Sequence, residues 1–227
     1  MQPAVVIFDF DGTLTSRDSF LDFCIRYCCE RPARLLFVLV LLPLAVLLLL
    51  GRSAGAAGSV LLWAMTLGSS TRSFVLALRS YAKSTLPRYA HASIFNELAQ
   101  HVADGSRVVI ATGSLPILAH GLLAARQLGR LPVVGTRLRR KWGGLVAPTH
   151  CVGQVKVAEL SRRFGITAWT SVYTNSFADC ALMRGVSSIT LVDPSASTLR
   201  RTTQLAAKTT PLRILRPARP GEPLGGT

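Results

Sequence analysis

The stretch Asp-Phe-Asp-Gly-Thr-Leu-Thr, residues 9–15, directly follows the apolar run Ala4–Phe8. The apolar run predicts a buried strand, and two aspartates at alternate positions can project to the same side of the chain where that strand ends. Gly12 supplies the backbone freedom that a sharp turn needs. An acidic turn without chemical use is the alternative on local grounds, because Asp and Gly are common turn residues. The sequence therefore predicts a buried strand that ends in a pair of carboxylates.

Such a pair suits phosphoryl transfer, and later parts of the chain supply groups that could complete it. One carboxylate can attack phosphorus while the other moves protons. The negative charge of the phosphoryl oxygens must then be held by other groups. Thr112 directly follows the predicted strand Arg107–Ala111. Its hydroxyl, with the backbone N–H groups of Gly113 and Ser114, can hold a phosphate at the start of the next helix.

Three further positions offer charge and metal ligands. Lys156 lies near the start of a predicted helix and gives a point positive charge. Asn175 and Asp179 follow another predicted strand and offer an amide oxygen and a carboxylate to a metal ion. Each signal is weak alone, because Thr-Gly-Ser is a common turn and a helical lysine is usually solvated. Their order after the paired aspartates makes the set persuasive.

The spacing of the first two strands indicates an inserted domain. Nearly a hundred residues separate the strand at 3–8 from the next comparable strand at 107–111. We expect residues 16–104 to form a helical cap, inserted into a catalytic core made of residues 1–15 and 105–193.

The second half of the chain alternates between helical and strand patterns, which predicts a mostly parallel sheet with helices on both faces. Residues 194–227 are basic and rich in Pro and Gly towards the end, so we expect that segment to be partly disordered over its last dozen residues. The elements expected after Thr112 are helices at 116–128 and 154–164 and strands at 131–134, 145–147, 171–173 and 188–192.

Composition points to an anionic partner. The chain has 227 residues and a formal net charge of +15, with basic residues spread along its length. Nucleic acid and an anionic membrane both satisfy that charge, but 49% hydrophobic residues favour the membrane. The basic residues also lack the interleaved aromatics of a nucleic-acid stacking surface. A solvated basic surface is the alternative. Five cysteines without metal-binding spacing, and an N-terminus without a secretory signal, predict reduced thiols in the cytoplasm.

One apolar segment is too hydrophobic for an ordinary surface helix. Leu35–Leu50 contains no polar side chain and has Pro43 at its centre. As one helix, 16 residues would rise roughly 24 Å, short of the ~30 Å hydrocarbon core. A single crossing would also place the two halves of one site on opposite sides of the membrane. We therefore expect the segment to dip into the membrane and to turn at Pro43. The weaker apolar stretch Gly58–Leu67 would pack beside it as the return arm or lie in the membrane interface. A helix buried in the cap's own core is the alternative.

From residue 8 to about residue 183 the chain resembles the HAD-IB phosphatases of the haloacid dehalogenase superfamily, and among them the phosphatidylglycerophosphatase C family. Asp-x-Asp-Gly-Thr carries the superfamily resemblance. The finer resemblance rests on Leu42-Pro43, Gly51-Arg52, Leu61-Leu62-Trp63, Gly143-Gly144, Cys151 with Gly153 and Lys156, and the pattern from Tyr173 to Asp179. It implies a Rossmann-like parallel sheet between helices, with a helical cap of the C1 type that contacts the membrane through residues 35–50.

The resemblance also implies roles for the site residues. Asp9 would form an aspartyl-phosphate, and Asp11 would protonate the leaving alcohol and later deprotonate water. Thr112 and Lys156 would hold the phosphoryl group, next to the substrate-binding Gly113 and Ser114. Mg²⁺ would be bound by the Asp9 carboxylate, the Asp11 carbonyl and Asn175, with Asp179 in support. The family usually has Asp where this chain has Asn175, so we expect weaker metal binding with activity retained.

These observations lead to a main hypothesis with two alternatives. The main one is Mg²⁺-dependent hydrolysis of a lipid phosphomonoester, most simply phosphatidylglycerophosphate, at the cytoplasmic face of the inner membrane. Its partners would be the anionic phospholipid substrate and the membrane surface, with no nucleic acid; the oligomeric state is left open. A soluble phosphatase resembling phosphoserine phosphatase and a non-catalytic membrane-binding homologue are the alternatives. The basic cluster of Arg137, Arg139, Arg140 and Lys141 ahead of Trp142 could meet the headgroup or simply be solvated.

Overall fold

The predicted first strand lies at the centre of a parallel sheet. In the computed structural model, which describes residues 3–51, 53–206 and 210–218, β1 (Val5–Phe8) belongs to a six-stranded sheet of order β3-β2-β1-β6-β7-β8. All neighbouring strands run parallel. The predicted α/β class is confirmed. The other strands are β2 (Arg107–Ala111), β3 (Val133–Val134), β6 (Ser171–Thr174), β7 (Ser188–Val192) and β8 (Leu212–Leu215).

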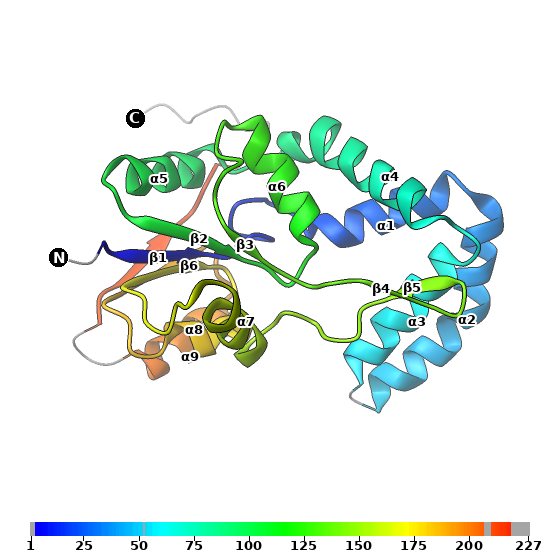
Figure 1. The fold of residues 1–227 in the computed structure, drawn as a ribbon. Helices are drawn as coiled ribbons and strands as arrows, with labels where there is room; N and C mark the ends of the chain where they lie inside the picture. Colours follow the sequence, from blue (N-terminus) through cyan, green and yellow to red (C-terminus); the bar gives the residue numbers. More distant parts are fainter. Residues whose placement is uncertain (1–2, 52, 207–209, 219–227) are drawn as a thin grey trace.

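Alternating side chains on the strands build two hydrophobic layers, one on each face of the sheet. On β1, Val6 and Phe8 pack into one layer, whereas Ile7 packs into the other. Two helices, α5 (Ala92–Ala103) and α6 (Pro116–Ala125), cover the first face (Figure 1). The opposite face is covered by α7 (Gln154–Phe164), α8 (Cys180–Met183) and α9 (Ala196–Leu205).

A helical cap projects from one end of the sheet, on the right in Figure 1. Asp18 and Ser70 cap the N-termini of α1 and α4 with side-chain hydrogen bonds. Aromatic side chains of these two helices pack together, and α4 in turn lies on α6. The cap consists of α1 (Ser19–Cys29), α2 (Pro32–Leu50), α3 (Ala54–Thr66), α4 (Thr71–Ser84) and the short 3₁₀ helix η1 (Leu86–Tyr89).

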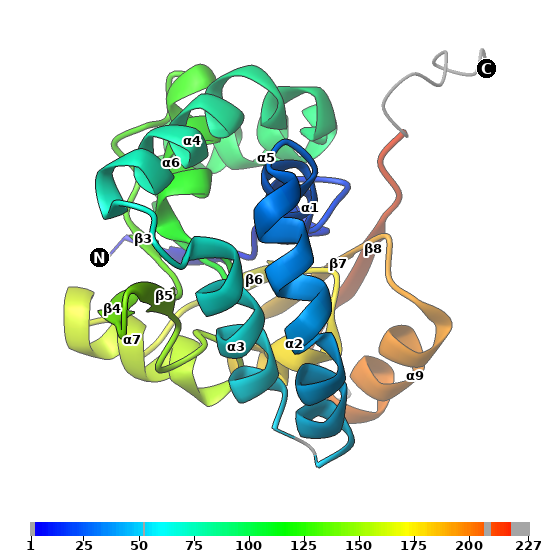
Figure 2. The same ribbon diagram turned by 90° about the vertical axis from the view of Figure 1, so that its right-hand side faces the viewer.

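The apolar helix α2 runs straight through Pro43. The predicted turn at Pro43 is therefore wrong; the chain reverses only after Gly51, beyond the end of the helix. The return arm is α3, which lies alongside α2, as Figure 2 shows. Of the α2 residues only Ala45 is fully buried. The alternative of a helix buried in the cap's own core is therefore also wrong.

A small antiparallel hairpin that extends from the core packs against the cap. Its strands, β4 (Arg139–Lys141) and β5 (Gly144–Val146), lie between β3 and α7 in the sequence and reach out to α3. The hydroxyl of Thr66 accepts a hydrogen bond from the Leu145 backbone at 2.8 Å. A Cβ at Gly144 would lie 2.6 Å from the Trp63 ring, so only glycine allows this close contact.

The chain leaves the core and returns to it as a paired ribbon. The Ser16 N–H donates to the Tyr89 carbonyl at 2.8 Å, and the His91 N–H donates to the Leu14 carbonyl at 2.9 Å. Beyond this ribbon, α5 lies on β2 of the sheet although it falls within the predicted cap range 16–104. The division into residues 1–15 with 105–193, 16–104 and 194–227 stays a prediction.

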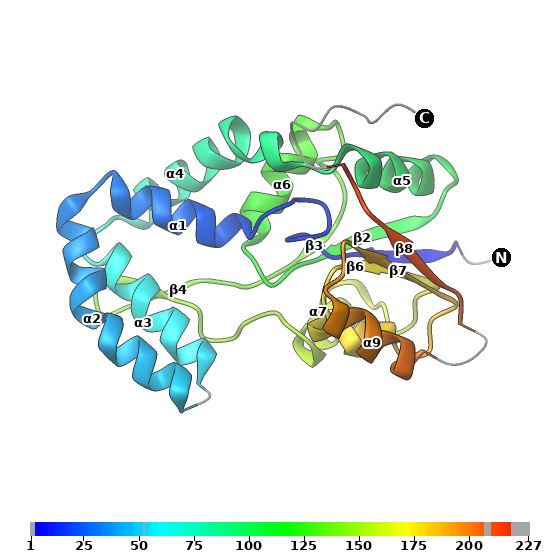
Figure 3. The same cartoon turned by 180° about the vertical axis from the view of Figure 1, so that it is seen from behind.

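The segment after residue 193 contains two regular elements that the sequence pattern did not predict. Helix α9 begins after Ser195, whose hydroxyl accepts from the Thr198 N–H, and β8 extends the sheet beside β7. From β8, Arg213 binds both carboxylate oxygens of Glu97 on α5, at 2.7 and 2.9 Å. Figure 3 shows β8 at the edge of the sheet, running towards α5. Of the last dozen residues, 216–218 carry no regular structure, and 219–227 lie outside the described residues.

Candidate active site

The first carboxylate of the site stands at the end of β1. The Asp9 N–H donates to the Tyr173 carbonyl at 2.8 Å, so the sheet hydrogen bonds continue to the point where the carboxylate leaves the strand. Gly12 then turns the chain with φ of +74°. The Asn175 side chain lies against Gly12, where any Cβ would come within 1.9 Å of its amide nitrogen. The turn and Asn175 thus fit together only because position 12 is glycine.

A buried lysine joins two buried aspartates beside this turn. Lys156 Nζ lies 2.7 Å from Asp9 Oδ1 and 2.7 Å from Asp179 Oδ1, and all three residues are buried. The second oxygen of Asp179 accepts a hydrogen bond from the Thr174 hydroxyl at 2.9 Å. Gly153, with φ of +53°, starts α7 and sets Lys156 in its first turn. Asp179 therefore positions the ammonium group that faces Asp9, while its predicted support of a metal stays a prediction.

Electrostatics in this cluster come from burial opposed by ion pairing. Burial raises the pKa of Asp9 to about 6, although the attraction of Lys156 works in the opposite direction. Burial alone would lower the pKa of Lys156, but the charges of Asp9 and Asp179 outweigh it and raise that pKa. Lys156 therefore stays a cation throughout the physiological range. It offers a fixed positive charge to a phosphoryl group at Asp9.

The second carboxylate connects the catalytic turn to the cap. Asp11 Oδ1 accepts a hydrogen bond from the backbone N–H of Ser19, the first residue of α1, at 2.8 Å. Burial raises the pKa of Asp11 to about 7, and the hydrogen bonds from Ser19 only partly offset it. A carboxyl group with a pKa near neutrality is suited to give and take protons at physiological pH.

The loop after β2 is held rigid by its own hydroxyl groups. Thr112 is fully buried, and its Oγ1 accepts from the Ser114 N–H at 2.9 Å. The Thr136 hydroxyl donates to the Gly113 carbonyl at 2.5 Å. Ser114 Oγ lies 3.2 Å from Ser19 Oγ on the cap. Gly113 and Ser114 face the cavity, whereas Thr112 shapes the loop behind them, and its predicted grip on phosphate stays a prediction.

The donor set at this edge fits a hard divalent cation. Within the described residues, no three His, Cys, Asp or Glu side chains cluster as a metal site. The expected ligands differ from such a cluster, because they combine the Asp9 carboxylate with the Asp11 backbone carbonyl and the Asn175 amide oxygen. Asn175 packs against the Asp9–Gly12 turn, so these oxygens belong to one small region. Oxygen ligands of this kind suit Mg²⁺.

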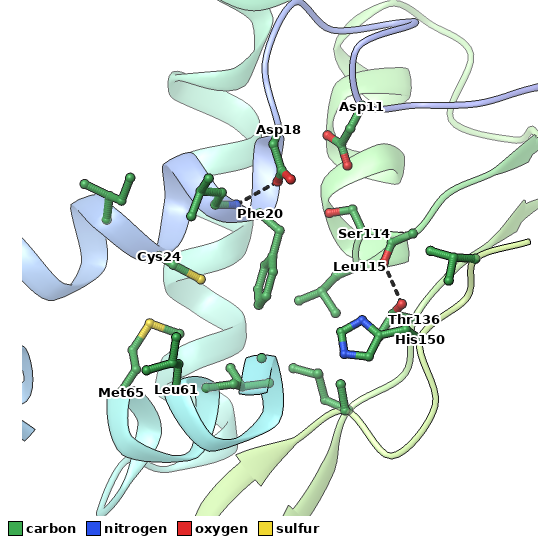
Figure 4. A pocket seen from close by; sticks show the side chains of 18 of the residues that line it. Asp11, Asp18, Phe20, Cys24, Leu61, Met65, Ser114, Leu115, Thr136 and His150 are labelled. Carbon is green, nitrogen blue, oxygen red and sulfur yellow. Dashed lines mark hydrogen bonds between the residues drawn. The ribbon is translucent and has the colours of Figure 1, made fainter. Parts of the chain in front are cut away.

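A cavity of about 690 Å³ opens from these residues towards the cap. Figure 4 shows Asp11 and Ser114 on one side, Leu61 and Met65 on the other, and the His150 ring between them beside Thr136. Most of the remaining wall is apolar. The apolar lining residues include Phe20, Leu35, Val38, Leu62, Leu115 and Leu138.

The residues predicted from the sequence come together at one edge of the sheet. Asp9, Asp11, Gly113, Ser114, Lys156, Asn175 and Asp179 all line the cavity. Ser19, Thr136 and His150 were not predicted as site residues. Ser19 and Thr136 carry only a common hydroxyl, and the four histidines of the chain have no metal-binding or catalytic spacing. No local pattern could have placed Thr136 and His150 at the cavity, or Ser19 beside Asp11 and Ser114.

Known proteins resemble this chain over most of its length. The profile of the haloacid dehalogenase-like hydrolases matches residues 6–184. Protein CicA of Caulobacter vibrioides is 28% identical over 188 residues, which cover 80% of this chain and 82% of that protein.

Solved structures share the fold. A protein of unknown function from Bordetella pertussis Tohama I superimposes with a TM-score of 0.67 at 16% identity, covering 95% of this chain and 99% of its own. A phospho-aspartyl intermediate analogue of phosphoserine phosphatase gives a TM-score of 0.58 at 15% identity, covering 96% and 95%. Identities this low show a common fold and leave the substrate open.

Proposed function

We propose that this chain, which belongs to the haloacid dehalogenase-like hydrolase family, hydrolyses a phosphomonoester carried by a membrane lipid. Its structural neighbours include phosphatases. The observation that carries the lipid part of the proposal is α2. This helix is apolar all round, mostly uncovered by protein, and contributes Leu35 and Val38 to the wall of the catalytic cavity.

The exposure of α2 is what a lipid environment would explain. Val40, Leu47 and Leu50 are 67%, 65% and 78% exposed. A helix that is hydrophobic on every side is stable inside a protein core or in lipid, and α2 is not inside a core. Among the described residues, α2 alone is a single helix long and apolar enough to cross a membrane, and the bent α3–α4 pair could form a second candidate. Such a count is weak evidence without the exposure.

The hairpin tip supplies a second contact of the same kind. Trp142 is 80% exposed, and the Lys141 ammonium lies over its ring at 4.3 Å. The Trp63 ring of α3 donates to the Trp142 carbonyl at 3.0 Å, so the tip is fixed beside the α2–α3 pair. Tryptophan and basic residues are enriched where proteins meet the headgroup layer.

The packing favours a helix that enters the lipid without crossing it. The 19 residues of α2 would rise about 28 Å, close to the ~30 Å hydrocarbon core. However, α1 before it and α3 after it both line the cavity that contains Asp9. Both neighbours must therefore stay on the same side of the membrane as the site. We place this side at the cytoplasmic face of the inner membrane, as the sequence predicts.

The site residues fit a two-step hydrolysis. The Asp9 carboxylate attacks phosphorus, and the bond to the leaving alcohol breaks as Asp11 donates its proton to the alcohol oxygen. Asp11, now a carboxylate, accepts a proton from water as the water oxygen attacks the aspartyl-phosphate and releases inorganic phosphate. Lys156 faces Asp9 throughout, where it balances the charge of the phosphoryl oxygens. A bound Mg²⁺ would supply further neutralisation of that charge.

Asp9→Asn tests catalysis itself. We expect Mg²⁺-dependent phosphate release from an aryl phosphate to fall by at least ~10³-fold, because the nucleophile is lost. Asp104→Asn changes an exposed aspartate at the end of α5 and serves as the matched control. Equal background release from the wild type, Asp9→Asn and Asp104→Asn would leave only a non-catalytic membrane-binding homologue.

A small soluble phosphomonoester is the second candidate, because the proteins that share this fold include phosphoserine phosphatase. The phosphoserine phosphatase structure superimposes on 96% of this chain. A phosphate-release screen that includes phosphoserine and lipid phosphomonoesters in vesicles separates the two candidates. The lipid proposal expects a preference for the lipid and would be overturned by a preference for phosphoserine. Within the lipid class, phosphatidylglycerophosphate is our first choice, on the sequence resemblance alone.

A further inference from the structure

The catalytic cavity has two ends of different chemistry. At one end lie the carboxylates, Lys156 and Asn175, and at the other the walls are the side chains of α1, α2 and α3. Among the described residues that line it, Lys156 is the only lysine or arginine, and both Asp9 and Asp179 already bind it. The described residues of the cap end therefore offer no free cation to a second anionic group. They do offer apolar surface from Phe20, Leu35, Val38, Leu62 and Met65.

Of the described polar side chains that line the cavity between these ends, His150 carries an atom without a hydrogen-bond partner. The Nε2 atom of His150 is buried and has no hydrogen-bond partner among the described residues. The ring faces α3, where a Cβ built at Gly58 would lie 3.7 Å from it. A buried polar atom without a partner is costly, and a ligand that supplies one removes that cost. Along the cavity, the phosphate-binding end is therefore followed by this hydrogen-bonding group and then by apolar walls.

We infer that the cap end of the cavity is an acyl-chain site, in which the substrate inserts the first part of a hydrocarbon chain while His150 bonds to its polar linker. The inference deepens the proposed function and rests on it. The ligand class is an amphiphilic phosphomonoester whose linker carries an ester or a hydroxyl group and no second phosphate. Phosphatidylglycerophosphate, which carries a second phosphate before its acyl chains, fits this cavity less well than the sequence resemblance suggests. The cavity volume of about 690 Å³ lies in the range of pockets that enclose small ligands. Part of the substrate's hydrocarbon chain thus leaves the bilayer and enters the protein.

Binding of non-hydrolysable alkylphosphonates tests this site without requiring turnover. Affinities for butyl, octyl and dodecyl phosphonate would be measured by calorimetry, below their micelle concentrations and with Mg²⁺ present. We expect affinity to rise by up to about fourfold for each added methylene until the chamber is full. The heat-capacity change on binding should become more negative along the same series. Equal affinity for all three chains would overturn the inference.

A substitution on α3 tests where the chain lies. Gly58→Leu adds a side chain that projects towards His150 inside the cavity, and leucine favours a helix more than glycine does. We expect it to weaken dodecyl phosphonate binding at least tenfold and to leave butyl phosphonate within about twofold. Ala56→Leu adds the same side chain at an exposed α3 position outside the cavity and should change neither. An equal loss for both chain lengths in Gly58→Leu would contradict the site.

His150→Phe tests the linker contact. We expect it to reduce five- to tenfold the preference for a monoacylglycerol phosphonate over an alkylphosphonate of equal length, since one hydrogen bond is lost. A purely structural role would weaken both ligands equally and would refute the linker contact. The two levels of the proposal fail differently. Flat chain-length dependence with normal lipid-phosphate hydrolysis removes only the acyl site, whereas no hydrolysis of any phosphomonoester removes the proposed function.

Discussion

Two helices of similar composition occupy opposite environments in this molecule. Helix α6 is apolar and lies between the sheet and α4, where Leu118, Leu122 and Leu123 are fully buried. Helix α2 is more apolar still, yet Leu36, Leu47 and Leu50 are more than 60% exposed. Composition is therefore a poor guide to burial. What differs is the covering: α6 has partners on two sides, while α2 is packed mainly on α3.

Helix α2 presents an unburied apolar surface in a fold that is otherwise well packed. Leucines on α6 stabilise the folded chain by being removed from water. Most leucines on α2 stay exposed within this chain and gain no such stabilisation there. The environment that would stabilise them therefore lies outside the chain. The site shows the converse departure, because it buries the charged groups of Asp9, Lys156 and Asp179. Departures from the usual distribution of polar and apolar groups mark functional regions.

Breaking the apolar face of α2 should produce the largest effect. Leu36, Val40 and Leu47 share one side of the helix, and replacing all three with Gln removes most of the apolar area on that side. We expect co-sedimentation with anionic vesicles to weaken on the order of 10³-fold, at roughly 1.5 kcal/mol for each side chain. Hydrolysis of a soluble aryl phosphate should not change.

The control for that triple variant is Leu76→Gln, which alters an exposed leucine on α4. It should retain vesicle binding within about threefold. If the triple variant still binds vesicles as the wild type does, α2 is not the membrane contact and the comparison with α6 loses its functional meaning.

A matched pair of alanine substitutions measures the same contrast in folding. Leu122→Ala in α6 should lower the free energy of unfolding by about 2–5 kcal/mol, because it leaves a cavity between the sheet and α4. Leu47→Ala in α2 should change it by less than ~0.5 kcal/mol, since that side chain is already exposed. Urea denaturation in the absence of lipid checks both values. Similar losses for the two variants would mean that α2 is covered in solution, for instance by a second copy.

The buried carboxylates should make stability depend on pH. The pKa of Asp11 rises to about 7 in the folded chain, against an ordinary value near 4, because of burial. Below about pH 4 the group is protonated in both states; as the pH rises towards 7 only the unfolded chain loses the proton, so stability is lost. Asp11→Asn should remove this loss, so that its Tm advantage over the wild type in EDTA is larger at pH 8 than at pH 5. An advantage that does not vary with pH would contradict the raised pKa.

The smallest expected effect concerns the metal. Asn175→Asp restores a carboxylate next to the Asp9–Gly12 turn and should lower the Mg²⁺ concentration for half-maximal activity about tenfold, as one more negative charge faces the cation. A magnesium titration of aryl-phosphate hydrolysis measures it. Ser176→Asp places the same charge one residue later and is the control. No change in Asn175→Asp would show that position 175 does not bind the metal.

Much of the core could be predicted because its signals are local. The strands at 107–111 and 188–192 and the helix at 154–164 lie at the residues that the patterns indicated. The predicted site residues meet because parallel strands present their carboxyl ends at one edge, so strand order alone brings Asp9 close to Asn175.

The rest depended on contacts that are remote in sequence. Strand β8 depends on pairing with β7, and the short run Leu212–Leu215, interrupted by Arg213, does not by itself indicate a strand. Helix α2 continues through Pro43 because the backbone hydrogen bonds of its other residues and its packing on α3 keep it helical. Ser19 reaches Asp11 from the cap, and His150 reaches the cavity from the loop before α7; nothing in their neighbouring residues predicts either position.

The hairpin's attachment to α3 limits how the enzyme can open. The cap is joined to the core by the ribbon at Ser16 and Tyr89 and again by the two connections of the β4–β5 hairpin, which is bonded to Thr66. A wide swing of the cap would have to stretch both attachments at once. We therefore expect ligands to exchange through a permanent mouth beside α2, with product leaving by the route that substrate took. Cross-linking the cap to the core should then slow turnover far less than it would in an enzyme that opens by a hinge.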